Sequence, residues 1–394
     1  MTDLAELMRR CLAVFEAEYL DGKTNLVYDY RTTLDHEHRF DHLPTPDEVA
    51  RRVPNPCSWG SGMENSMINT PIALSMYLDA GNAEMAYRMY RGLKLCGTVT
   101  NVPGALVRSV HPGDGRSWFP EASRDQYTHY VYGLWEYYHS PLADDTARAE
   151  IRELLAAVAD HCEKYVTKEN DYTLPRADFD PVRSPVCKLW EVEPHEAARL
   201  PMFYLAAFDV TGDQHYFGLY RRYAEEAGRA GNRLECMNYN SFALLQMLLS
   251  CLLIHAVERD EALRALYLEN MREIFRYSFF NLLRAANWKR TADLYLAPMD
   301  WHWNSYCRVY PGCRHVIPQL ADDVKLAYQT MREIGEVLLI ALMLPEEIRA
   351  VGGAHRRNFR FVLDGFEPER YFFAEGTFFP AAACFKARKL GVEL

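Results

Sequence analysis

The chain alternates between strongly apolar helical segments and amphipathic ones, which short polar turns join in pairs. In each pair the first segment is the more apolar and the second has one apolar face. A helix that is apolar all round is buried on every side, whereas an amphipathic helix lies half exposed to water. The predicted pairs are 66–78 with 83–93, 127–138 with 144–165, 196–210 with 214–227, 240–257 with 260–281, and 324–343 with 345–354. The pattern therefore predicts an all-α fold with buried helices inside half-exposed ones.

A repeat of helix pairs in this order suits a toroid, in which an inner ring of helices lies inside an outer ring. An opening helix over 3–19 and a closing helix over 375–389 bring the count to roughly six hairpins. Polar turns with glycine, at 79–82 and 211–213, join the two helices of two of these pairs. We therefore expect one (α/α)6 toroid domain over residues 1–394.

Strand patterns are weak and limited to 24–28 and 359–363. Long connections containing Gly, Pro and Trp remain at 98–122, 171–194 and 285–322. Loops of this length inside a compact domain are usually functional. In a toroid of hairpins we expect them to line the mouth where the inner helices begin.

Charge and hydropathy exclude several classes of protein. The formal net charge of −10 argues against non-specific nucleic-acid binding, which draws its affinity from Lys and Arg. The longest apolar stretch, 241–257, is slightly short for a membrane span and contains polar residues. The N-terminus carries acids where a secretory signal has a basic flank and an apolar run. We therefore expect a cytoplasmic protein that binds neither nucleic acid nor membrane.

Cysteine spacing favours separate buried thiols over a metal site. The chain has ten cysteines, and without an export signal most are expected to be reduced. Cys307, Cys313 and His315 lie close together in the sequence, but their spacing fits no common zinc pattern. No dinucleotide or phosphate-binding motif is present. We expect no metal and no cofactor, and the sequence leaves a homo-oligomer open.

The segment 123–135 combines a guanidinium, a carboxylate and an imidazole with several aromatic rings at a predicted helix start. Asp125 and His129 are four residues apart and therefore share one helix face. With Arg124 and His129 nearby, Asp125 should stay ionised and suit a base or water-positioning role. The alternative is a structural aspartate that interacts with the helix dipole.

A second polar helix start lies at 60–71, where Glu64 and Asn65 precede an apolar helix. Trp59 and Met63 surround Glu64 with apolar groups. Desolvation disfavours the charged carboxylate, so Glu64 is a candidate general acid. The alternative is that Glu64 caps the helix or pairs with an arginine. Two polar, aromatic-rich helix starts in a helical chain indicate a sugar-binding cleft.

Three further clusters could bind substrate. Trp301, His302 and Trp303 combine indole faces with a hydrogen-bonding group and form a plausible saccharide platform, unless the two indoles fill the core. Tyr239 and Asn240 open the most apolar helix, where a plain N-cap is the alternative role of Asn240.

Arg108, His111 and Arg124 are candidates to clamp a substrate carboxylate. A guanidinium matches a carboxylate with two parallel hydrogen bonds. The alternative is that each of these side chains is an ordinary surface charge.

These segments resemble the six-hairpin glycosidase superfamily, whose (α/α)6 toroid has its active site at the mouth formed by the inner helices. Residues 65–71, Asn-Ser-Met-Ile-Asn-Thr-Pro, are similar to a segment of unsaturated glucuronyl and rhamnogalacturonyl hydrolases, in which a catalytic aspartate opens an inner helix. Residues 124–127, Arg-Asp-Gln-Tyr, look like their Arg-Gly-Gln-aromatic helix. Asn65 stands where the catalytic aspartate would fall, and Asn cannot supply a proton. Either Glu64 takes over, Asp125 carries the acid role, or the chemistry differs from hydration of an unsaturated uronide.

The resemblance and the residues together predict a glycoside hydrolase that acts on short oligosaccharides with a terminal uronic acid. Glu64 would protonate the leaving oxygen or the sugar double bond, and Asp125 would activate water. Arg124 and His129 would orient the carboxylate, while 301–303 would bind sugar rings.

Two other enzyme classes stay open at this point. In a polysaccharide lyase, His302 or a tyrosine abstracts the proton next to a carboxylate that Asn240 and an arginine neutralise. In a sugar epimerase of the same fold, His129 and His302 serve as acid and base.

Overall fold

The computed structural model describes residues 3–181, 185–234, 239–298, 307–309, 316–318 and 322–394. Within these residues the regular structure is almost entirely helical, which confirms the all-α prediction. The strands in this part of the chain are β1 (Cys307–Val309) and β2 (Val316–Pro318), which pair antiparallel within the long connection predicted over 285–322. None of the described helices is both long and apolar enough to cross a lipid bilayer.

Six largely buried helices form the interior of the described structure. They are α3 (Ser66–Ala80), α5 (Arg124–His139), α7 (Arg199–Thr211), α9 (Ser241–Val257), α11 (Asp322–Met343) and α13 (Glu375–Lys389). Helix α3 packs against α5, α5 against α7, α7 against α9, α9 against α11, and α11 against α13. Helix α13 in turn packs against α3, so the inner helices form a closed series of contacts.

Amphipathic helices cover this interior from outside. They are α1 (Leu4–Val14), α4 (Ala83–Thr98), α6 (Asp145–Tyr165), α8 (Gln214–Gly231), α10 (Glu261–Trp288) and α12 (Gly353–Leu363). Helix α4 packs on α3, α6 on α5 and α7, and α8 on α7, while α10 and α12 pack on α11 and α1 packs on α13. Their solvent-facing sides account for the alternation of apolar and amphipathic segments in the sequence.

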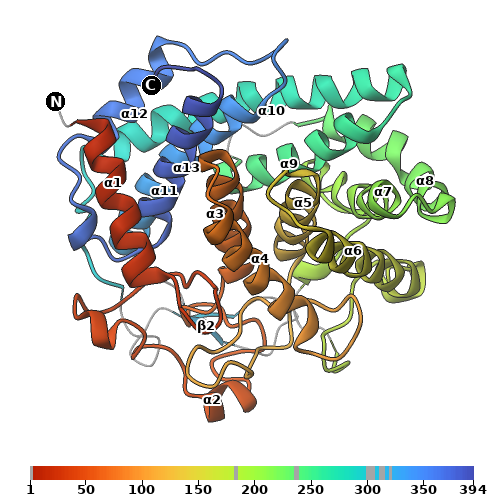
Figure 1. Ribbon diagram of the computed structural model, residues 1–394, viewed down its shortest axis with the longest axis horizontal. Coiled ribbons are helices and arrows are strands. Elements are labelled where there is room, and N and C mark those ends of the chain that lie inside the picture. Colours follow the sequence, from red (N-terminus) through yellow and green to blue (C-terminus); the bar gives the residue numbers. More distant parts are fainter. Residues whose placement is uncertain (1–2, 182–184, 235–238, 299–306, 310–315, 319–321) are drawn as a thin grey trace.

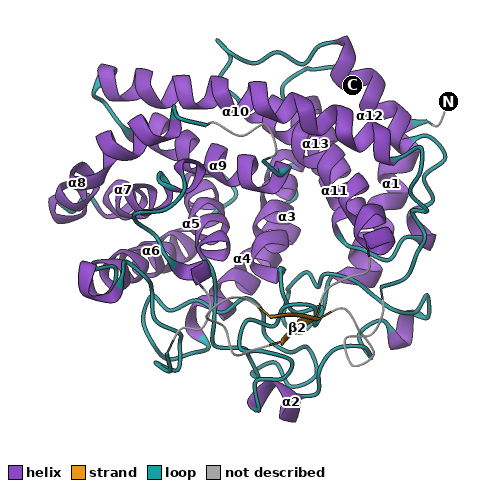
Figure 2. Cartoon of the chain, turned by 180° about the vertical axis from the view of Figure 1, so that it is seen from behind, coloured by secondary structure: helices purple, strands orange, loops and turns teal. Residues whose placement is uncertain are grey.

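Short helical turns complete the described structure. The turn from Phe15 to Tyr19 is a π-helix that continues α1, and α2 spans Pro46–Ala50. The 3₁₀ turns are His36–His38, Lys168–Asn170, Pro185–Cys187, Pro194–Glu196 and Pro368–Arg370. Both views of the molecule show the long loops gathered with α2 and the β hairpin along one edge of the helical body (Figures 1 and 2).

Glycines close the two predicted turns at 79–82 and 211–213. Gly81 ends α3 with φ of 70°, and Gly212 ends α7 with φ of 75°. Glycine adopts this left-handed conformation without the steric cost of a Cβ atom. The chain therefore reverses within two residues and lays α4 along α3 and α8 along α7.

Two predicted boundaries are wrong. The last outer helix is α12 (Gly353–Leu363) rather than 345–354. The predicted strand 359–363 belongs to this helix, because the buried side chains of His355, Phe359 and Val362 recur at helical spacing. The strand predicted over 24–28 does not form, because Thr24 lies in a turn and Asn25 has a φ of 55°; only Val27 makes an isolated bridge, with Leu20.

Helices α11 and α13 approach each other closely at Gly335. A Cβ atom at this position would lie 2.6 Å from the Cβ of Phe379 and 2.9 Å from the backbone nitrogen of Pro380. Glycine therefore permits the tight contact that joins these two inner helices.

Candidate active site

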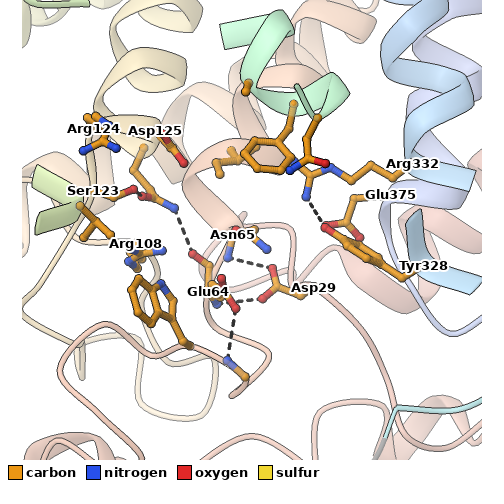
Figure 3. A pocket seen from close by; sticks show the side chains of 18 of the residues that line it. Asp29, Glu64, Asn65, Arg108, Ser123, Arg124, Asp125, Tyr328, Arg332 and Glu375 are labelled. Carbon is orange, nitrogen blue, oxygen red and sulfur yellow. Dashed lines mark hydrogen bonds between the residues drawn. The ribbon is translucent and has the colours of Figure 1, made fainter. Parts of the chain in front are cut away.

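A cavity of about 660 Å³ opens where the inner helices begin (Figure 3). All six of these helices contribute residues from their N-terminal part or cap to its wall: Asn65 and Ile68; Ser123, Arg124, Asp125 and Gln126; Arg199; Asn240, Phe242 and Ala243; Lys325, Tyr328 and Arg332; and Glu375. The six helices therefore run parallel to one another. Their N-termini direct the positive ends of the helix dipoles toward the cavity.

Glu64 lies in the loop directly before α3 and faces this cavity (Figure 3). Its Oε2 accepts a hydrogen bond from the Gly60 N–H at 3.2 Å, and its backbone carbonyl accepts one from Gln126 Nε2 at 3.2 Å. Burial raises the pKa of Glu64, and the cation of Arg108 acts against that rise. The carboxyl group forms no ion pair with a described residue and does not cap α3, so neither structural alternative applies.

Asp125 lies in the first turn of α5 and also lines the cavity. Its Oδ1 accepts a hydrogen bond from Nη1 of Arg199, the first residue of α7. Burial alone would raise the pKa of Asp125, but the charges of Arg199 and Arg124 outweigh it and hold the pKa below its usual value. The two carboxyl groups of one cavity thus have oppositely shifted pKa values, as an acid and a base require.

Most guanidinium groups of the cavity have a carboxylate partner. Arg124 Nη2 lies 2.5 Å from Glu196 Oε1, and Arg332 Nε donates to Glu336 Oε1 at 2.7 Å. Arg199 pairs with Asp125, as described above. These arginines are therefore neutralised within the protein.

Arg108 differs from the other guanidinium groups of the cavity. Its side chain is almost fully buried, with 3% of the residue exposed. Nε donates to the backbone oxygen of Glu121 at 3.1 Å, and the guanidinium carbon lies 5.6 Å from the ring centre of Trp59. No carboxylate of the described residues lies within ion-pair distance of it. The wall beside Glu64 therefore carries a buried cation without a described carboxylate at ion-pair distance, although its charge acts to lower the pKa of Glu64 and of Asp125.

The wall formed by α11 and α13 carries a further carboxyl group, Glu375 (Figure 3). Its Oε1 accepts hydrogen bonds from Asn69 Nδ2 at 3.2 Å and from the Tyr328 hydroxyl at 3.4 Å. Arg332 donates to the same hydroxyl oxygen. Burial raises the pKa of Glu375 to about 7, although Arg332 acts against the rise.

The structure brings Glu64, Asn65, Arg108, Arg124, Asp125, Tyr239 and Asn240 to one cavity, all of which the sequence indicated. Tyr239 packs against the imidazole of His195, with 5.0 Å between ring centres. Asn240 is the N-cap residue of α9, as the alternative predicts, but its side chain makes no capping hydrogen bond.

Neither His111 nor His129 lines the cavity. His111 is buried, and its Nε2 lies 2.6 Å from the carbonyl oxygen of Pro44, so it holds a loop in place. His129 shares a helix face with Asp125 but lies one turn deeper, with 1% exposed, and burial lowers its pKa to about 3. Trp301, His302 and Trp303 lie outside the described residues.

The sequence did not indicate several cavity residues: Asp29, His195, Glu196, Arg199, Tyr328, Arg332 and Glu375. A usable signal exists for Arg199 and Glu375, because each is a buried charged residue at the first position of an inner helix whose next turns are mostly apolar. Asp29 lies at a bend outside the helices, in a segment without helical periodicity, where no such signal exists. Among the described residues no group of three or more His, Cys, Asp or Glu side chains could hold a metal ion.

No protein-family model matches the chain, and no curated protein matches it by sequence. Among solved structures, the chain is similar to a sugar epimerase from a ruminal bacterium, at 12% sequence identity and a TM-score of 0.48. The alignment covers 99% of this chain and 100% of the epimerase chain. This likeness is too remote to transfer an activity.

Proposed function

We propose that the chain is a single (α/α)6 toroid domain and a sugar-processing enzyme, a glycoside hydrolase that releases a terminal uronic acid from a short oligosaccharide. The closed series of contacts among the inner helices supports the toroid. The observation that carries the function is the placement of Glu64 and Asp125 in one cavity with opposite pKa shifts.

The two carboxyl groups divide the chemistry between them. Glu64 holds the proton and donates it to the glycosidic oxygen, or to the double bond of an unsaturated uronide. Asp125 is ionised, accepts a hydrogen bond from the attacking water and takes its proton as the new C–O bond forms. Arg199 holds the Asp125 carboxylate in place through the hydrogen bond to Oδ1.

Arg108 supports an anionic substrate. Its Nε is already bonded to the Glu121 carbonyl, which leaves both Nη groups for two parallel hydrogen bonds to a carboxylate. A bound carboxylate would also neutralise a buried charge that has no partner among the described residues. The rings of Trp59, Tyr239 and Phe242 line the same cavity and offer flat apolar faces to a sugar ring.

An absorbance assay tests this function. An unsaturated uronyl disaccharide absorbs ultraviolet light through its C4=C5 double bond, and a hydrolase of this kind makes that absorbance fall. With a saturated uronide as substrate, the hydrolase produces new reducing ends. A rise in absorbance on a saturated polyuronide would instead identify a lyase. A change in the ratio of sugar isomers with neither effect would identify an epimerase. Either of these two results contradicts the hydrolase proposal.

A further inference from the structure

Gln126 connects the loop of the proposed acid to the helix of the proposed base. It follows Asp125 in the first turn of α5, and its buried side chain forms part of the cavity wall. Its Nε2 donates to the backbone carbonyl of Glu64 at 3.2 Å. One side chain therefore spans from α5 to the residue that carries the proposed acid.

The amide group of Gln126 is itself held in one orientation. Ser123, the N-cap residue of α5, makes no capping bond to the helix and instead donates from its hydroxyl to Gln126 Oε1. A side-chain amide carries its donors on nitrogen and its acceptor on oxygen. Because the Ser123 hydroxyl bonds to the oxygen, the nitrogen points to the Glu64 carbonyl.

The backbone at Glu64 is held from its other side by Asp29. Oδ2 of Asp29 accepts the N–H of Glu64 at 2.8 Å, and Oδ1 accepts the N–H of Asn65 at 2.9 Å (Figure 3). The backbone of Asp29 bonds in turn to the carbonyl of Gly62 at 3.2 Å and to the N–H of Ala374 at 2.9 Å. These bonds tie Glu64 to its own loop and to the start of α13.

The proposed acid and base have to act on one substrate together. Glu64 must reach the glycosidic oxygen while Asp125 holds the attacking water, so the separation of the two carboxyl groups is part of the mechanism. Asp125 lies in α5, and the bond from Gln126 ties Glu64 to this same helix. The position of the acid relative to the base therefore depends on the Gln126 side chain.

Building on the proposed function, we propose that Gln126 is a positioning residue that sets the separation of Glu64 and Asp125. It does so through the hydrogen bond to the Glu64 carbonyl, in an orientation that Ser123 fixes. Without this bond the loop that carries Glu64 can shift relative to α5. A displacement of about 1 Å in such a site can lower the rate by about 100-fold.

Gln126→Met tests this role, because methionine is of similar length and cannot donate to the Glu64 carbonyl. For a uronyl disaccharide, kcat should fall by about 10- to 100-fold while KM stays within about threefold of the wild-type value. A nitrophenyl uronide should lose much less, because nitrophenolate leaves without a proton from an acid. A purely structural role would lower the amount of active enzyme and reduce both rates equally. Equal losses, or a disaccharide kcat within about twofold of the wild type, would overturn the proposal.

Tyr267→Phe is the matched control. Tyr267 lies on the outer helix α10, is buried and does not line the cavity, and its hydroxyl donates to the backbone carbonyl of Ala224 at 2.7 Å. This variant also loses one buried bond to a backbone carbonyl, so it should lose stability in the same way. Its kcat should match the wild type for both substrates. A selective loss with the disaccharide in Tyr267→Phe as well would overturn the proposal.

A second measurement needs no substrate, so it separates failure of this inference from failure of the proposed function. Amide hydrogen exchange over residues 60–67 should be about tenfold faster in Gln126→Met than in the wild type and unchanged in Tyr267→Phe. Unchanged exchange in Gln126→Met overturns the inference even if the wild type hydrolyses uronides. If the wild type hydrolyses neither substrate, the proposed function fails, and the exchange rates alone decide whether Gln126 holds Glu64.

Ser123→Ala gives the same test if Gln126→Met does not fold. It removes the hydroxyl that orients the Gln126 amide and leaves the amide in place. Its kcat should fall more for the disaccharide than for the nitrophenyl uronide, with faster exchange over 60–67. Equal losses for the two substrates, or unchanged exchange, would overturn the inference.

Discussion

Replacing Arg108 by methionine removes the buried guanidinium and keeps an unbranched side chain in its place. The folded protein loses the bond from Nε to the Glu121 carbonyl, at 3.1 Å, and the cation–π contact with Trp59, at 5.6 Å. Each is worth about 1 kcal/mol. The substitution also removes a buried charge that lacks a carboxylate partner among the described residues. This removal stabilises the folded protein, because burying such a charge costs several kcal/mol of desolvation free energy. Arg108→Met should therefore be as stable as the wild type or more stable by about 1–2 kcal/mol.

Substrate binding should change in the opposite direction. A hydrogen bond between two charged groups contributes about 1.5–3 kcal/mol, so kcat/KM for a uronide should fall by about 10- to 150-fold. For the same disaccharide with a neutral hexose in place of the uronic acid, kcat/KM should change little, because this substrate has no carboxylate to bind the guanidinium. The assay is kcat/KM for both substrates, together with urea unfolding of each variant.

Arg124→Met is the matched comparison for stability. Arg124 Nη2 lies 2.5 Å from Glu196 Oε1, and the Glu196 side chain is only 8% exposed. Removing this arginine leaves a buried carboxylate without its closest cation, which should cost about 2–4 kcal/mol. The reasoning would be refuted if Arg108→Met lowered the free energy of unfolding as much as Arg124→Met does and the variant still had a higher kcat/KM for the uronide than for the neutral disaccharide.

Two further predictions concern the wall formed by α11 and α13. Burial raises the pKa of Glu375 to about 7. Above about pH 4 the folded protein therefore keeps a proton on Glu375 that the unfolded chain has lost. As a result, the free energy of unfolding falls as the pH rises toward 7. Glu375→Gln should flatten this fall when unfolding free energies at about pH 5 and pH 8 are compared, and an unchanged slope would contradict the buried acid. Gly335→Ala should lower the free energy of unfolding by about 1–3 kcal/mol, because its Cβ would lie 2.6 Å from the Cβ of Phe379. Gly352→Ala, which meets no atom within 4 Å, is the control, and equal effects of the two would refute the close contact.

The sequence predicts that Glu64 and Asp125 lie in one cavity because each stands at the start of a largely buried inner helix. A polar residue at such a position has no place in the core, and in a ring of parallel inner helices all such positions face the same mouth. The same reasoning extends to Arg199 and Glu375, which also open inner helices.

Other features depend on geometry that periodicity does not contain. Asp125 pairs with Arg199 of the neighbouring helix, although Arg124 is its neighbour in the sequence, because consecutive helical residues point about 100° apart. His129 shares the face of Asp125, but four residues correspond to about 6 Å along the helix, which takes its imidazole below the cavity. Asp29 reaches Glu64 from a bend outside the helices, which tertiary hydrogen bonds to Gly62 and Ala374 hold in place.

The most direct test of the central claim is the turnover of an unsaturated uronyl disaccharide by Glu64→Gln, measured beside Glu16→Gln. Glu16 accepts a hydrogen bond from the Tyr77 hydroxyl at 2.8 Å and does not line the cavity, so its variant controls for the loss of a carboxylate elsewhere. If Glu64 supplies the proton, Glu64→Gln should lower kcat by about 10² to 10⁴ while Glu16→Gln stays close to the wild type. Near-normal turnover by folded Glu64→Gln would contradict the account.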